Sequence, residues 1–318
     1  MRVWAHDRWP FPLPPRHTYP QSKYGLLRER LIAEGVCGPG DFIEAEPVRW
    51  SELIKVHDVA LMGRIRRGQL SVREQRGLGL PWSPQLVERA RRSASGTVQA
   101  AYAAFQVGVA MNLGGGTHHA GRDFARGYCL FNDVALATSR LREARLAQRV
   151  LVVDCDVHQG DGTAQLLRPD PHAFTLSVHG ARNYPFKRIP SDLDVDLPRA
   201  TSDTEYCAAL ESALATALTR DGYDIAFYLA GADPWEGDRL GTLGLTKAGL
   251  RRRDALVLDA LRGAGLPVCV VLAGGYAPNI ADTVDINAAT AIEVAVRRTS
   301  IDRGGPDAKL ALEPRDAA

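Results

Sequence analysis

Short, continuous apolar runs alternate with longer amphipathic segments along this 318-residue chain. The runs at 150–154, 224–230 and 267–272 are rich in β-branched residues, which predicts strands buried on both faces of a sheet. Further strands are predicted at 41–45 and 173–178. Helical patterns separate the strands and cover residues 23–34, 84–111, 131–146, 202–220, 247–262 and 279–298. The alternation predicts an α/β fold: a single domain with a central, mainly parallel sheet and helices on both faces.

Proline and glycine mark the loops and the end of this domain. The helix at 84–111 begins with Ser83-Pro84, a capping residue followed by proline at the first helical position. Two proline-rich stretches, 10–20 and 185–198, are interpreted as ordered surface loops. The domain is expected over residues 1–300, and the polar segment 301–318 is expected to be a flexible tail.

Composition narrows the class of protein. With 45% hydrophobic residues, a chain of this length can bury one large core. A net charge of +2 is nearly balanced, which gives no indication of a nucleic-acid-binding face. The basic clusters 64–67 and 251–253 are interpreted as solvated helix surfaces rather than docking patches. No apolar run approaches membrane-spanning length.

The five cysteines are odd in number and scattered, and they never form a Cys-x-x-Cys pair. This usage argues against a disulfide framework and against a thiolate zinc site. No basic segment followed by an apolar core stands at the N-terminus, so no signal peptide is predicted. We therefore expect a cytoplasmic protein.

Candidate metal ligands follow the predicted strands. Asp156 and His158 come directly after the run at 150–153, and residues two apart in an extended segment point to the same side. Asp233 follows the strand at 224–230, and Tyr276 follows the strand at 267–272. Open α/β sheets bind ligands at the carboxyl ends of their strands. Two carboxylates and one imidazole supply the three protein ligands of a catalytic zinc site, which keeps one position open.

Taken singly, each of these residues has an ordinary structural explanation. Asp154 could cap the helix that begins near Asp161, and Asp233 before proline could be a turn residue. Tyr276 could be a core aromatic with its hydroxyl at the rim. The glycine run 114–116 could cradle a phosphate, but no Lys-Ser/Thr follows it and a predicted helix precedes it. Joint occurrence at strand ends favours the metal site.

Four motifs in one order resemble the histone deacetylase family of the arginase-deacetylase superfamily. They are the pair His118-His119, the segment Asp154-x-Asp156-x-His158 with a further Gly-Asp-Gly, then Gly231-Ala-Asp233 and Gly274-Gly-Tyr276. The resemblance spans residues 15–295. The opening segment 16–24 and Asn183-Tyr184-Pro185 resemble the bacterial members closest to class IV. Four ordered motifs are far more specific than one.

The resemblance implies roles for the groups around the metal. His119 would take the proton from the attacking water and later deliver one to the leaving amine, while His118 would assist electrostatically. A histidine in such a role needs its other nitrogen held by an acceptor. Asp161 is the expected partner of His119, and Asp154 that of His118. The hydroxyl of Tyr276 would stabilise the oxyanion.

The resemblance also implies cofactors. One zinc ion per chain would be held by Asp156, His158 and Asp233. A potassium ion would lie beneath the zinc-bearing loop, held by backbone carbonyls of that loop and by a serine hydroxyl on the next strand. The matching positions are Asp154, Asp156, His158, Ser177 and Val178.

The substrate is less well defined. Gly127 and Tyr128 match the family's tunnel wall, Tyr184 is a candidate opposite wall, and Trp82 could cover the entrance. Two aromatic walls suit a methylene chain. The first interpretation is a zinc-dependent deacylase of acyl-lysine in proteins or peptides. Alternatives are deacetylation of a small acylated amine such as an acetylpolyamine, and a metal-binding regulatory module without turnover. A two-manganese enzyme is disfavoured because too few ligands are present.

Overall fold

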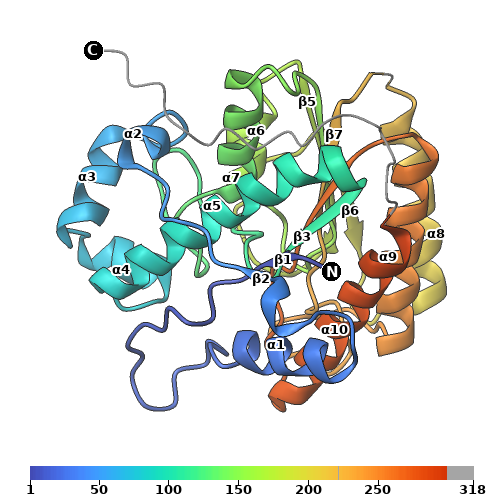
Figure 1. Ribbon diagram of the computed structural model, residues 1–318, viewed down its shortest axis with the longest axis horizontal. Helices are drawn as coiled ribbons and strands as arrows, with labels where there is room; N and C mark the ends of the chain where they lie inside the picture. The colour runs from blue at the N-terminus through green and yellow to red at the C-terminus, as the bar shows by residue number, and fades with distance from the viewer. Residues whose placement is uncertain (221, 299–318) are drawn as a thin grey trace.

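In the described part of the chain, eight strands form one sheet in the order β2-β1-β3-β8-β7-β4-β5-β6, and every neighbouring pair is parallel. The computed structural model describes residues 1–220 and 222–298 (Figure 1). The strands are β1 (Val3–Trp4), β2 (Phe42–Ile43), β3 (Val109–Asn112), β4 (Val150–Asp154), β5 (Ala173–Gly180), β6 (Leu193–Leu197), β7 (Ile225–Leu229) and β8 (Val268–Val271). The predicted α/β class with a parallel sheet is confirmed.

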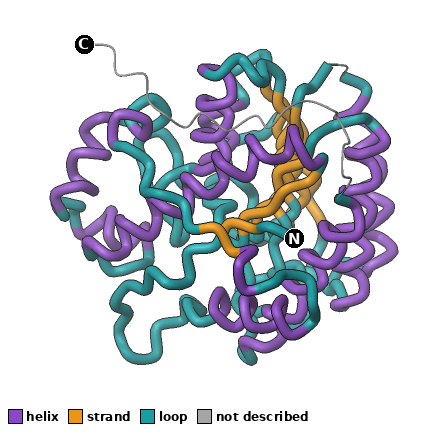
Figure 2. The backbone as a smooth tube through the Cα atoms, viewed as in Figure 1, coloured by secondary structure: helices purple, strands orange, loops and turns teal. Residues whose placement is uncertain are grey.

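Helices cover both faces of this sheet (Figure 2). They are α1 (Lys23–Ala33), α2 (Trp50–Leu53), α3 (Val59–Arg67), α4 (Val72–Leu78), α5 (Pro84–Val107), α6 (Asp133–Glu143), α7 (Asp161–Leu167), α8 (Asp203–Leu218), α9 (Lys247–Gly263) and α10 (Ile280–Arg297), with one 3₁₀ turn at Pro39–Asp41. Helices α5 and α6 pack together on one face, whereas α8, α9, α10 and α1 form the layer on the other. None of the described helices is long and apolar enough to cross a membrane.

Each uniformly apolar strand contributes side chains to two hydrophobic cores, one on each face of the sheet. In β7, Phe227 and Leu229 pack in the core beneath α5 and α6, while Ala226 and Tyr228 pack in the core beneath α8 and α9. Successive side chains of a strand point to opposite faces, so a strand covered on both faces has no polar position. The central strands therefore show no hydrophobic–polar alternation in the sequence.

Two predicted elements are wrong in extent. The helix predicted over 84–111 ends at Val107, and Gly108 takes a positive φ of 75° before strand β3 begins. An alanine-rich helix passes into a four-residue strand there with only one glycine between them. The stretch 185–198, interpreted as a loop, contains strand β6. The predicted tail 301–318 lies outside the described residues.

The connection after β3 consequently differs from the prediction as well. The glycine run 114–116 follows a strand rather than a helix. The pair His118-His119 therefore lies past the carboxyl end of a strand, at the same sheet edge as the residues that follow β4, β7 and β8. Strands β3, β8, β7 and β4 are adjacent in the sheet, so four consecutive strand ends border one site.

Candidate active site

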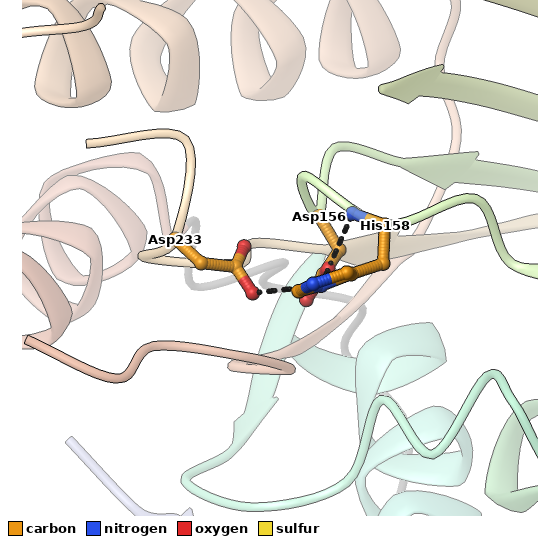
Figure 3. Close-up of side chains that lie close together, drawn as sticks. All are labelled: Asp156, His158 and Asp233. Atoms are coloured by element: carbon orange, nitrogen blue, oxygen red, sulfur yellow. Dashed lines mark hydrogen bonds and ion pairs between the residues drawn. The ribbon is translucent and has the colours of Figure 1, made fainter. Parts of the chain in front are cut away.

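Asp156, His158 and Asp233 meet at the carboxyl edge of the sheet (Figure 3). Their ligand atoms all lie within 4.8 Å of one another, and all three residues are buried. The register aligns the last residue of β4, Asp154, with Leu229, the last residue of β7. Residues 155–158 and 231–233 consequently leave the sheet side by side, and we call these two segments the metal-ligand loops.

The contacts among these three side chains leave charge and hydrogen-bonding capacity that a bound metal ion would satisfy. His158 Nδ1 lies 2.9 Å from Asp156 Oδ1 and 3.2 Å from Asp233 Oδ2. Asp233 Oδ2 is nevertheless buried without a hydrogen-bond partner among the described residues. Burial raises the pKa of Asp233 to about 7, and the neighbouring Asp156 carboxylate adds to that shift. Two buried carboxylates and a converging imidazole nitrogen are a set that a divalent cation would satisfy.

Glycine permits this close approach at two positions. A Cβ atom on Gly274 would lie 2.0 Å from Asp233 Oδ2, and the Gly274 amide donates to Asp156 Oδ2 at 2.7 Å. A Cβ atom on Gly231 would lie 2.7 Å from the Asp156 Cα. Both glycines are therefore required where the loops after β4, β7 and β8 touch.

The histidine pair lies in the loop after β3, residues 114–120, which we call the histidine loop. His118 Nδ1 is 2.7 Å from Asp154 Oδ2, and His119 Nδ1 is 2.5 Å from Asp161 Oδ1. Each histidine thus has a carboxylate beside its Nδ1, and neither of these two contacts uses Nε2. Arg126 also forms an ion pair with Asp161.

The two histidines experience opposite electrostatic environments. Burial alone would lower the pKa of His118, but the carboxylates of Asp154 and Asp156 outweigh it and raise the pKa to about 9. Burial lowers the pKa of His119 well below 6.5, and the imidazoles of His118 and His158 lower it further. His118 is therefore suited to carry a positive charge, whereas His119 is suited to accept a proton.

Tyr276 lies in the loop between β8 and α10. Burial raises the pKa of its hydroxyl well above 10, and the Asp156 and Asp233 carboxylates raise it further. The phenol therefore stays protonated and can donate a hydrogen bond. Its backbone amide donates to Asp238 Oδ2 at 2.6 Å, and this bond fixes the loop that carries it.

One cavity of about 470 Å³ joins these groups. His118, His119, Asp156, His158 and Tyr276 all line it. Cavities of this size are typical of small-molecule sites. The predicted metal ligand Asp233 lies behind this surface and is wholly buried.

Three of the four residues expected at the substrate walls line the cavity. Tyr128, its neighbour Gly127 and Tyr184 line the cavity. The rings of Tyr128 and Tyr276 are 5.7 Å apart, and those of Tyr184 and His119 are 4.9 Å apart. Trp82 is not among the residues that line the cavity. Its indole N–H instead donates to the Ile65 carbonyl at 2.7 Å, which anchors the segment between α4 and α5 on α3.

The residues matched to a potassium site also lie together. Asp154 on β4 pairs with Ser177 on β5, and Val178 follows on the same strand. Asp154, Asp156, His158, Ser177 and Val178 are all buried. The Ser177 hydroxyl is 2.9 Å from His179 Nδ1, so it already takes part in a hydrogen bond.

Several cavity residues were missed by sequence reasoning. Lys23 is only 2% exposed, lines the cavity and is 3.5 Å from the Ala273 carbonyl. Arg182 and Phe186 line the cavity near Tyr184, and Phe186 is 90% exposed. A lone lysine in an N-terminal segment and a basic residue just before a proline-rich stretch carry no pattern that would mark them.

A sequence profile of the histone deacetylase domain matches residues 17–291. An uncharacterized protein of Picosynechococcus sp. is 42% identical over 281 residues, covering 88% of this chain and 93% of that protein. Histone deacetylase 2 of Arabidopsis thaliana is 29% identical over 286 residues, with 85% and 73% covered.

Solved structures share the fold. A histone deacetylase homologue complexed with SAHA superimposes with a TM-score of 0.80 at 22% identity, covering 93% of this chain and 84% of that chain. A homologue from Aquifex aeolicus gives a TM-score of 0.79 at 21% identity, with 92% and 83% covered.

Proposed function

Because the chain belongs to the histone deacetylase family, we propose that it is a zinc-dependent amidohydrolase that removes an acyl group from the ε-amine of lysine in proteins or peptides. Family membership supports deacetylase chemistry. The observation that carries the proposal is one cavity lined by two carboxylate-paired histidines, two of the three candidate metal ligands and a protonated tyrosine. The acyl group could be acetyl or longer.

Asp156, His158 and Asp233 would hold one zinc ion per chain. Three protein ligands are the number that a catalytic zinc keeps, with a further position open. Zinc in this site would lower the pKa of a water molecule toward about 7 and polarise the acyl carbonyl. A potassium ion beneath the loop, at the backbone of Asp154 to His158 and at Ser177-Val178, is part of the same proposal.

His119 would act as general base and then as general acid. Asp161 holds its Nδ1, so Nε2 receives a proton as water attacks and returns one to the leaving amine. His118, paired with Asp154 and carrying positive charge, would stabilise negative charge that develops nearby. The division of roles is supported by the opposite pKa directions of the two imidazoles.

Tyr276 would donate its hydroxyl to the oxyanion of the tetrahedral intermediate. The aromatic walls Tyr128 and Tyr184 would enclose the methylene chain of the lysine and keep the acyl amide away from bulk water. The presence of His118, His119 and Tyr276 in one cavity argues against a regulatory module without turnover.

The charges that line the cavity favour acyl-lysine over an acetylpolyamine. Lys23 and Arg182 line it, whereas the only carboxylate among its lining residues within the described chain is the metal ligand Asp156. A polyamine arm is cationic and would meet like charge without a carboxylate to pair with.

All five cysteines are buried and unpaired, which supports the proposed reducing, cytoplasmic compartment.

A panel of fluorogenic acyl-lysine peptides of increasing acyl length, run beside acetylated polyamines, tests this function. We expect turnover of acyl-lysine that is lost on chelation and restored by added zinc. Tyr276→Phe should retain zinc and lose about 10²–10³ in kcat. Turnover of the polyamines alone, or full activity of the chelated protein, would contradict the proposal.

A further inference from the structure

Arg253 is a wholly buried arginine on α9, behind the two metal-ligand loops. The cluster 251–253 is interpreted from the sequence as a solvated surface, and for Arg253 this is wrong. Arg251 and Arg252 are exposed, but Arg253 is 0% exposed. A guanidinium that has lost its hydration must be paired and hydrogen-bonded within the protein. Its partners therefore indicate why it is buried.

On the helix side, Arg253 is held by Asp254. Nε and Nη2 donate to Asp254 Oδ1 at 2.9 and 2.8 Å. The Tyr228 hydroxyl on β7 also donates to Oδ1, at 2.5 Å, and the Thr290 hydroxyl on α10 donates to Oδ2 at 2.6 Å. Donors from β7 and α10 thus hold the Asp254 carboxylate, which in turn orients the guanidinium.

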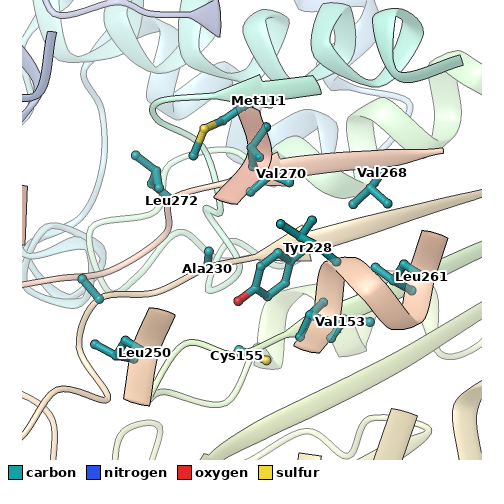
Figure 4. Packing of buried hydrophobic residues seen from close by; sticks show 14 of the residues in the cluster. Met111, Val153, Cys155, Tyr228, Ala230, Leu250, Leu261, Val268, Val270 and Leu272 are labelled. Atoms are coloured by element: carbon teal, nitrogen blue, oxygen red, sulfur yellow. The ribbon is translucent and has the colours of Figure 1, made fainter. Parts of the chain in front are cut away.

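On the sheet side, Arg253 Nη1 reaches the backbone of both metal-ligand loops. It donates to the Gly231 carbonyl at 2.6 Å and to the Cys155 carbonyl at 3.3 Å. Both carbonyls lie just beyond the ends of β7 and β4. Cys155 and Tyr228 lie in the core beside α9, the helix that also carries Leu250 and Leu261 (Figure 4).

The position of these carbonyls connects Arg253 to the ligands. Cys155 directly precedes Asp156, and Gly231 is two residues before Asp233. The two carboxylates repel each other, and their separation is set by the backbones that carry them. One guanidinium nitrogen shared by both backbones opposes the spreading of the loops from the side away from the cavity.

We propose that Arg253 is a positioning residue that holds the two metal-ligand loops at the spacing a metal ion requires. The inference rests on the proposed metal function of Asp156, His158 and Asp233. Groups that orient metal ligands without touching the metal typically contribute 10–100-fold in metal affinity. Arg253 touches neither substrate nor metal, and its effect is transmitted through the backbone.

Zinc affinity of the metal-free protein, measured by competition with a chelator, tests the proposal. Arg253→Lys keeps the positive charge beside Asp254. A lysine ammonium lacks the planar set of guanidinium donors that bonds to Asp254 and to the loop carbonyls at the same time. We expect about 10–100-fold weaker zinc binding. Arg251→Lys is the matched control: it lies on the same helix, is exposed and pairs with Glu293, and its zinc affinity should equal that of the native chain.

Hydrogen exchange of the metal-free variants separates positioning from folding. Peptides that cover 155–158 and 231–235 should exchange faster in Arg253→Lys, while the strands β4 and β7 keep their protection. Tyr228→Phe removes one support of Asp254 and should shift both readouts in the same direction by less. It replaces Arg253→Lys as the test if that variant does not fold.

The outcomes distinguish this inference from the metal assignment. If the native chain bound no zinc, the proposed function would fail, and loop exchange would still test whether Arg253 restrains the loops. If the native chain bound zinc and folded Arg253→Lys bound it equally well, with unchanged loop exchange, the positioning role would be overturned. Lower thermal stability alone would assign Arg253 to folding and would also overturn it.

Discussion

The metal-ligand loops and the histidine loop contribute to one site, but they are held in place by different means. The metal-ligand loops leave two adjacent central strands whose register aligns Asp154 with Leu229, and Arg253 bonds to both backbones from behind. The histidine loop leaves β3, two strands away from β7, and takes its shape from side chains on other elements.

Asp133 at the start of α6 provides part of that support. Its carboxylate accepts hydrogen bonds from the amides of Gly116 and Thr117 at 2.9 and 2.8 Å, and from the Thr97 hydroxyl at 2.6 Å. Damage to the first region should therefore remove metal, whereas damage to the second should remove catalysis and leave metal bound. The following predictions test this separation.

The largest effect is expected at the metal-ligand loops. Asp233→Ala removes one of three protein ligands, so bound zinc and activity should both be lost. Elemental analysis of the purified variant, beside a turnover assay, provides the measurement. Stoichiometric zinc in Asp233→Ala would show that the metal is held elsewhere.

The histidine loop should show the opposite behaviour. His119→Ala removes the proposed general base and should reduce kcat by about 10²–10⁴ with zinc retained. His118→Ala should be less damaging because its proposed role is electrostatic. Steady-state rates normalised to measured zinc compare the two variants. If His118→Ala kept native activity and His119→Ala lost zinc, the roles assigned to the two histidines would be wrong.

Asp133→Asn tests whether the histidine loop depends on its support. The asparagine side chain places an NH₂ donor opposite the N–H and O–H donors that the carboxylate of Asp133 accepts. This mismatch should destabilise the loop conformation by about 1–3 kcal/mol. Turnover should fall while zinc affinity stays at the native value. A parallel loss of zinc affinity would mean that the two regions are coupled more tightly than their separate supports indicate.

The smallest expected effect is on how the free energy of unfolding varies with pH. His57 Nδ1 is 2.8 Å from the Gly121 carbonyl, just after the histidine loop, and burial lowers the pKa of His57 to about 4. Between pH 6.5 and 4 the unfolded chain binds a proton that the native chain does not. His57 therefore favours unfolding in that range by up to about 1.4 kcal/mol per pH unit.

Replacing His57 by glutamine removes this titration. The free energy of unfolding of His57→Gln should vary less steeply than that of the native protein between pH 6.5 and 4, by up to one proton. Urea unfolding of both metal-free proteins across that range measures the two slopes. The other buried histidines are common to both proteins, so equal slopes would show that His57 is not the titrating group.

The sequence alone was sufficient for the parts of the molecule where one local pattern has one physical meaning. Uniformly apolar, β-branched runs require cover on both faces, and this predicted the central strands β4, β7 and β8. Asp156 and His158 follow β4 directly, Asp233 follows β7, and Tyr276 follows β8. The sheet edge where these residues meet followed from the rule that parallel strands present their carboxyl ends together.

Short elements and long-range partners were decided by the tertiary structure. Strand β3 has four residues and continues an alanine-rich helix, so only its pairing with β1 and β8 distinguishes it from that helix. Arg253 follows two exposed arginines, and nothing local distinguishes it from them. Its burial depends on carbonyls 22 and 98 residues away, which only the packing of α9 against β4 and β7 brings within reach.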